Sequence, residues 1–90
     1  MEEWTVLLVD DEEEFISALA ERLSFRGIQA RTATNGEEAL AAIEIEAPQV
    51  VVLDLMMPGM SGVEVLKHIR GTHPQIKVIL LTGHGSTREG

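Results

Sequence analysis

Four polar side chains that could act together stand at the ends of short apolar runs: Asp10, Asp11, Asp54 and Thr82. The runs cover residues 6–9, 50–53 and 78–81. Mg²⁺ prefers oxygen ligands such as carboxylates, and a carboxylate beside a bound cation can attack a phosphoryl group to form an aspartyl phosphate. A threonine hydroxyl can donate a hydrogen bond to a phosphoryl oxygen. These residue types therefore suggest one site for a divalent cation and a phosphoryl group.

Each of these residues also has a simpler structural interpretation. Asp11 could be the N-cap of a helix that begins at Glu12, because aspartate is a favoured capping residue. Asp54 could be an ordinary turn residue, and the Thr82 hydroxyl could bond to the backbone of its own turn. A shared site is favoured because Asp54 follows a run of large aliphatic residues and is the third acid expected at the same sheet edge.

The elements that must position these residues alternate between strands and helices. The sequence predicts strands over residues 4–9, 28–33, 49–53 and 76–81, and helices over residues 12–26, 37–47 and 63–70. This α/β pattern is typical of a parallel sheet with helices on both faces and right-handed crossovers. The second strand alternates in polarity, which predicts an edge, whereas the other three are expected to be buried on both faces. Ligands of such sheets bind outside the carboxyl ends of the strands.

Apolar residues at helical spacing predict which helix faces are buried. In the first helix, Phe15, Leu19 and Leu23 form one apolar stripe beside Ile16. Gly27 is expected to be the C-cap of that helix. In the second helix, the residues expected to face the core are Ala39, Leu40, Ile43 and Ala47.

The composition argues against several functions. The formal net charge of −8 disfavours binding of nucleic acid or of anionic membranes by this segment. The chain has no cysteine, so it has neither disulfides nor a thiolate metal site. Its first residues lack the features of a secretory signal, and no apolar stretch approaches the roughly 18–20 residues that span a membrane. We therefore expect a cytoplasmic protein without a membrane segment.

Three stretches of the chain resemble the receiver domain of two-component response regulators: residues 6–12, 50–62 and 78–83. The resemblance extends over the whole chain. It implies a flavodoxin-like, doubly wound parallel sheet with the strand order 2-1-3-4. It also implies that residues 1–90 are the N-terminal three-quarters of one receiver domain. The fourth helix, the fifth strand with its lysine and the fifth helix of the family would then be missing from this chain.

The resemblance further implies a role for each site residue. Asp54 would accept a phosphoryl group from the phosphohistidine of a histidine kinase or of a phosphotransfer protein. Mg²⁺ would be bound directly by Asp11 and Asp54, mostly through water by Asp10, and by the backbone carbonyl of Met56. Thr82 would bind the phosphoryl group and move with it, which would alter partner binding. Such a domain is a switch rather than a conventional enzyme, although it assists its own phosphorylation and dephosphorylation.

Two alternative functions remain open at this point. One is a receiver-like interaction module that is never phosphorylated. The other is a Mg²⁺-dependent phosphohydrolase with an aspartyl nucleophile, which would need a second acid two positions after Asp54, where this chain has Met56. In addition, a sheet that ends at residues 76–81 would leave an unpaired edge and an uncovered face. We therefore expect the chain to associate with itself or with an adjacent segment.

Overall fold

The computed structural model describes residues 4–57 and 59–81, which form four strands and three helices in strict alternation. The elements are β1 (Thr5–Val9), α1 (Glu13–Ser24), β2 (Gln29–Ala33), α2 (Gly36–Ile45), β3 (Val50–Asp54), α3 (Gly62–Thr72) and β4 (Lys77–Leu81). The predicted order of elements is confirmed. The largest differences in length are in α1, which begins one residue later and ends two residues earlier than predicted, and in α3, which begins one residue earlier and ends two residues later. α2 also ends two residues earlier than predicted.

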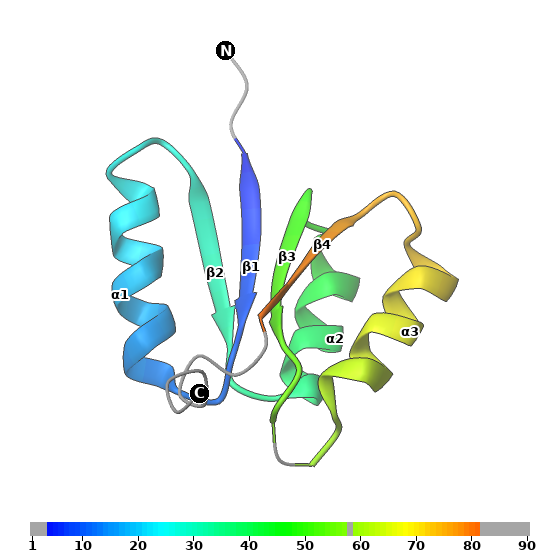
Figure 1. The fold of residues 1–90 in the computed structure, drawn as a ribbon. Coiled ribbons are helices and arrows are strands. Elements are labelled where there is room, and N and C mark those ends of the chain that lie inside the picture. The colour runs from blue at the N-terminus through cyan, green and yellow to red at the C-terminus, as the bar shows by residue number, and fades with distance from the viewer. Residues whose placement is uncertain (1–3, 58, 82–90) are drawn as a thin grey trace.

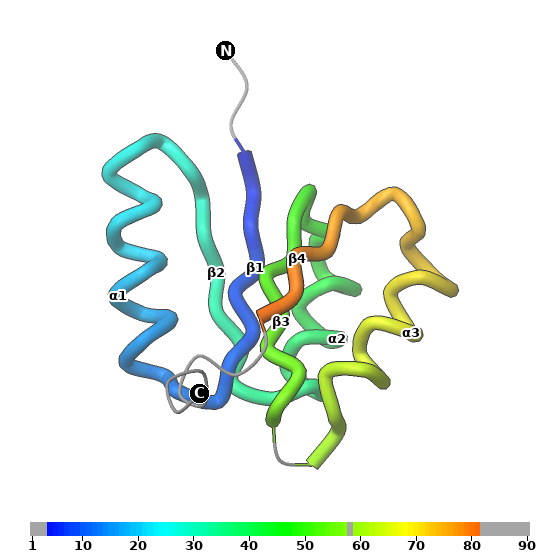
Figure 2. Tube along the Cα trace, in the orientation of Figure 1, coloured from blue at the N-terminus to red at the C-terminus, as the bar shows by residue number. Residues whose placement is uncertain are grey.

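The strands form one parallel sheet with the order β2-β1-β3-β4 (Figure 1). Both the doubly wound α/β architecture and this strand order were predicted. The pairing places Val9 beside Leu53 and Asp54 beside Leu81. Because all strands run the same way, their carboxyl ends lie at one edge of the sheet (Figure 2). β2 lies at an edge, as its alternating sequence indicated.

The helices cover the two faces of the sheet unequally. α1 packs on one face, where Val6 and Leu8 of β1 meet Ile16. α2 and α3 pack on the opposite face over a larger core (Figure 1). That core consists of residues from the sheet, from α2 and α3, and from the connections between them: Leu7, Val9, Ala33, Ala39, Ile43, Val51, Leu53, Met57, Val65, Ile69 and Ile76. The alternation of side chains along β1 and β3 thus supplies both cores.

Local sequence signals explain where the helices begin and end. After α1, the amide of Ile28 donates to the Leu23 carbonyl at 3.0 Å, and Gly27 has a φ of +82°. This is a Schellman ending in which Gly27 supplies the left-handed residue beyond the helix, whereas the C-cap position predicted for Gly27 is occupied by Phe25. Asn35 caps α2, and Ser61 and Glu64 form a capping box at α3.

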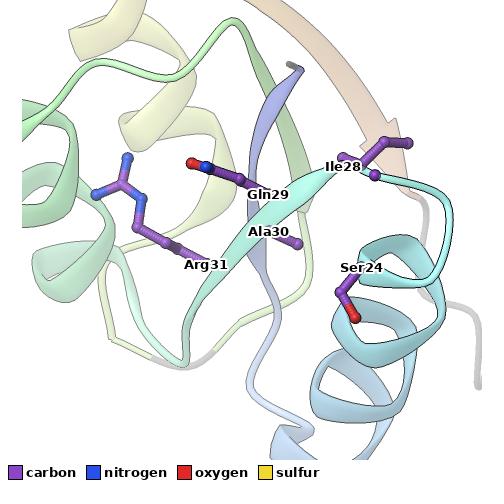
Figure 3. A pocket seen from close by; sticks show the side chains of 6 residues that line it. Ser24, Ile28, Gln29, Ala30 and Arg31 are labelled. Atoms are coloured by element: carbon purple, nitrogen blue, oxygen red, sulfur yellow. The ribbon is translucent and has the colours of Figure 1, made fainter.

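The carboxyl end of α2 is capped from the neighbouring edge strand. The guanidinium of Arg31 in β2 donates to the carbonyl oxygens of Ala42 at 3.2 Å and Glu46 at 2.6 Å. Figure 3 shows the Arg31 side chain extending from β2 toward this helix, while Ala30 lies on the other side of the strand. A positive group at a helix C-terminus is favourable, and the last turn of α2 has no basic residue of its own.

The predicted burial of two helix residues is wrong. Phe15 is 38% exposed, and Ile16 is the residue of α1 that is fully buried. The reason is that α1 packs over β1 and β2, which places the Ile16 side of the helix against the sheet. Ala47 is exposed because α2 ends at Ile45 and the chain becomes extended at Glu46.

The apolar run of β4 predicted burial on both faces, and this is wrong. The second expectation, that the sheet ends at this strand with an uncovered face, agrees with the exposure of its side chains. Ile79 is 52% exposed and Leu80 is 43% exposed. Ile79 pairs with Val52 on the α1 face, and Leu80 pairs with Leu53 on the opposite face. Within the described part of the chain β4 is the edge of the sheet, so its side chains have a neighbouring strand on one side.

In the ranges described, none of the helices has the length and apolar character needed to cross a bilayer.

Candidate functional site

The structure brings Asp10, Asp11 and Asp54 together at the carboxyl edge of the sheet. Asp10 and Asp11 follow β1, and Asp54 is the last residue of the adjacent strand β3. One carboxylate oxygen from each residue lies within 4.8 Å of the others. Asp10 and Asp54 are buried, whereas Asp11 is exposed. The cluster therefore has two acids at its base and one at the solvent side.

Backbone amides orient the two buried carboxylates. The amide of Glu12 donates to Oδ1 of Asp10 at 2.9 Å, and the amide of Met56 donates to Oδ1 of Asp54 at 3.0 Å. In each case the donor lies two residues after the acid, which is the pattern of an Asx turn. Sequence reasoning missed these two bonds, although the known tendency of aspartate to form them was a usable signal.

Asp11 does not cap α1, contrary to the simpler interpretation of this residue. The N-cap position is occupied by Glu12, whose side chain makes no capping hydrogen bond. Asp11 instead belongs to the acid cluster. Its exposed carboxylate is thus positioned by the turn between β1 and α1 rather than by the amides of the helix end.

The composition of this cluster fits a hard divalent cation. Three carboxylates whose oxygens lie within 4.8 Å of one another repel when they are ionised. A cation such as Mg²⁺ removes this repulsion and accepts oxygen ligands while keeping several waters. The backbone carbonyl of Met56, the further expected ligand, belongs to the loop that leaves Asp54. The side chain of Met56 is 68% exposed and does not fill the cluster.

The loop after β3 is held close to the strand by a glycine. An added Cβ at Gly62, the first residue of α3, would lie 2.5 Å from the carbonyl oxygen of Asp54 and 2.6 Å from Cα of Leu55. Only a hydrogen atom fits between α3 and this backbone. This close approach was not predicted from the sequence.

Thr82 lies outside the described residues. The residue before it, Leu81, pairs with Asp54 in the sheet, and the Leu81 carbonyl accepts a hydrogen bond from the amide of Leu55 at 3.2 Å. The end of β4 is therefore anchored beside the acid cluster.

A separate hollow of about 440 Å³ lies where α1 ends and β2 begins, lined by Ser24, Gly27, Ile28, Gln29, Ala30 and Arg31 (Figure 3). It contains none of the residues expected to form the site, and Arg31 is engaged in capping α2.

The chain was compared with known protein families to identify the family to which its fold and site belong. Residues 6–89 match the response regulator receiver domain. The chain belongs to that family. Its receiver domain is 40% identical over 85 residues to the probable transcriptional regulatory protein TcrX of Mycobacterium tuberculosis. It is 43% identical over 81 residues to the transcriptional regulatory protein CpxR of Klebsiella pneumoniae. These matches cover 94% and 90% of this chain.

The receiver domain also superposes on solved structures of the family. The response regulator protein TrrA of Thermotoga maritima, solved in complex with Mg²⁺-BeF, has a TM-score of 0.82 and 41% sequence identity. The match covers 96% of this chain and 75% of that one. The flavodoxin-like fold expected from the resemblance is thus shown. The chain spans about a third of the two regulators named above, 36% of TcrX and 34% of CpxR.

Proposed function

We propose that this receiver domain is a phosphoryl-accepting switch in which Asp54 is the phosphoacceptor and Mg²⁺ is the cofactor. The observation that carries the proposal is the convergence of three carboxylates within 4.8 Å at the carboxyl edge of the sheet. Asp10, Asp11, Asp54 and the carbonyl of Met56 would hold the ion. Its charge would offset the negative charge of the transferring group.

Each of these residues would have a separate role in phosphoryl transfer. An oxygen of the Asp54 carboxylate attacks phosphorus, the bond from phosphorus to the donor histidine nitrogen breaks, and its electron pair stays on the imidazole. The hydrogen bond from the Met56 amide at 3.0 Å holds the attacking carboxylate in place. The Thr82 hydroxyl would then donate to a phosphoryl oxygen. Its movement would bias the surface around β4 between two states.

The donor would be a histidine kinase or a phosphotransfer protein, and the domain would not turn over substrate as an enzyme. The position two residues after Asp54 is occupied by Met56, which cannot act as a general acid or base. A Mg²⁺-dependent phosphohydrolase is therefore disfavoured. A module that binds partners without being phosphorylated is the remaining alternative, and the following experiment separates it.

Treatment of the chain with acetyl phosphate and Mg²⁺ should add one phosphoryl group, detected by the mass of the intact protein. Asp54→Asn should take up none, because the amide cannot act as the nucleophile. Glu44→Gln, which neutralises an exposed acid of α2, should be modified like the wild type. A wild-type chain that gains no adduct, or an adduct that persists in Asp54→Asn, would contradict the proposal. Hydrolysis of many equivalents of donor would favour the phosphohydrolase.

We also propose that the 90-residue chain by itself associates with another copy through β4. The side chains of Ile79 and Leu80 expose apolar surface on opposite faces of this strand. Exposed edges and apolar surface of this kind promote pairing between chains. Light scattering after size exclusion should therefore give a mass above that of the monomer.

Ile79→Lys combined with Leu80→Lys should shift the chain toward the monomer, because charged side chains disfavour edge pairing. Ile45→Lys, at an exposed apolar residue at the end of α2, is the matched control and should leave the mass unchanged. A folded wild-type monomer at all concentrations would refute self-association.

A further inference from the structure

A contact between α2 and the loop after β3 leaves no room for a side chain at Gly36. This glycine is the first residue of α2 and is buried. A Cβ built at Gly36 would lie 2.8 Å from Sδ of Met60, 2.9 Å from its Cβ and 3.0 Å from its Cγ. Met60 belongs to the loop that connects β3 to α3, and its side chain packs against the larger core.

The Met60 side chain alone cannot relieve this contact. Rotation about the side-chain bonds can move Sδ and Cγ away, but it leaves Cβ in place because the backbone fixes that atom. An alanine at position 36 would therefore displace the backbone of the loop or of α2. The backbone conformation of Gly36 is not left-handed, so alanine is tolerated there in every respect except this contact.

The turn that carries Gly36 is anchored firmly enough to act as a support. Glu38 accepts hydrogen bonds from the amide and the hydroxyl of Thr34 at 2.9 and 3.1 Å, and its own amide donates to Oδ1 of Asn35 at 2.8 Å. At the start of the same turn, the Ala33 carbonyl accepts a hydrogen bond from the amide of Asp10 at 3.1 Å. The turn thus contacts the Asp10 side of the acid cluster and, through Gly36, the loop on the Asp54 side.

We propose that the close contact between Gly36 and Met60 is a positioning element that holds the loop after β3, and with it Met56, in register with the acid cluster. The inference rests on the proposed function, because it assigns the contact a role in binding Mg²⁺. Gly36 and Met60 do not touch the ion and act through the loop. Outer residues that position metal ligands change metal affinity by roughly 10–100-fold when they are altered.

The test uses Gly36→Ala, Met60→Gly and the double variant, with Gly71→Ala as the matched control. Gly71 lies in α3, and a methyl group added there would have nothing within 4 Å. Two quantities are measured: amide chemical shifts by NMR without metal, and Mg²⁺ affinity by calorimetry. Gly36→Ala should shift the amides of Met56 and Met57 and weaken Mg²⁺ binding by about tenfold. Gly71→Ala should do neither.

The double variant decides whether the contact itself is responsible. Met60→Gly removes all three contacting atoms, so Gly36→Ala should cost little further affinity in that background. If the Gly36→Ala variant does not fold but the double variant does, this result would support the role of the contact equally well. The inference is overturned if the changes in amide chemical shift in Gly36→Ala are confined to residues next to position 36. It is also overturned if the loss of Mg²⁺ affinity in the double variant equals the sum of the losses in the two single variants.

Failure of the proposed function would look different from failure of this inference. If the wild-type chain binds no Mg²⁺ and accepts no phosphoryl group, the proposed function falls, and the metal-free amide shifts still show whether Gly36 positions the loop. If the wild type binds Mg²⁺ and is phosphorylated while Gly36→Ala behaves as the wild type does, only the inference falls.

Discussion

Gly62→Ala is expected to lower the free energy of unfolding by about 2–4 kcal/mol, the range of severe overpacking in a protein interior. The methyl group would lie 2.5 Å from the Asp54 carbonyl oxygen and 2.6 Å from Cα of Leu55. Both are backbone atoms of β3 and of the residue that follows it, so neither can rotate away. Either α3 moves outward, which opens the contact of Val65 and Ile69 with the core, or the end of β3 is displaced.

Thermal unfolding of the two alanine variants measures this effect. For a domain of this size, 1 kcal/mol corresponds to roughly 4–8 °C in Tm, so Gly62→Ala should melt at least about 8 °C below the wild type. Gly71→Ala makes the same chemical change in the same helix with open space around it. It should be neutral or stabilise by up to about 1 kcal/mol, because alanine favours helices. Equal melting temperatures for Gly62→Ala and the wild type would show that the helix approaches the strand less closely than described.

Asp11→Asn is expected to have opposite effects on stability without and with Mg²⁺. Without metal, the substitution removes one of three mutually repelling carboxylates, so Tm should rise. With Mg²⁺, the wild type should gain stability in proportion to the logarithm of metal concentration, about 2.7 kcal/mol at a concentration 100 times Kd. The variant would lose a proposed ligand, so its Kd should rise at least about tenfold. At the same metal concentration the gain should then fall to about 1.4 kcal/mol or less.

Glu13→Gln is the matched control for Asp11→Asn. Glu13 is an exposed acid in the first turn of α1, close in sequence to the cluster but not a member of it. Its neutralisation removes a favourable interaction with the helix dipole, so Tm without metal should fall slightly and the response to Mg²⁺ should remain. The assignment of Asp11 to a metal site is contradicted if the two variants respond to Mg²⁺ in the same way.

The order of the fold could be predicted because each element carries its own signal. The apolar runs ending at Val9 and Leu53 are adjacent central strands, and Gly27 lies just beyond the end of α1, near the C-cap position predicted for it. The errors arose where burial depends on neighbours. Ile16 rather than Phe15 faces the sheet because α1 packs over β1 and β2, which the spacing of apolar residues within the helix does not reveal. Ile79 is exposed because β4 is an edge within the described residues, which follows from the order of the strands and not from the apolar run itself.

The sequence was sufficient to predict which residues form the candidate site, but not which backbone contacts hold them in place. The meeting of Asp10, Asp11 and Asp54 follows from strand ends at one sheet edge. The fit of Gly36 against Met60 and of Gly62 against the end of β3 depends on backbone paths far apart in sequence. A glycine at the start of a helix is common enough to suggest only a turn. These two contacts could therefore be recognised only in the structure.

The parallel direction of all strands limits how two copies of this chain can share β4. A closed dimer with a two-fold axis uses the same surface on both subunits, and a strand that pairs with its own copy about such an axis runs antiparallel to it. The joined sheet would be parallel within each subunit and reversed at the junction. The carboxyl edges of the subunits would then point in opposite directions. Each acid cluster would therefore face solvent on its own side of the dimer, and one donor protein could reach only one cluster at a time.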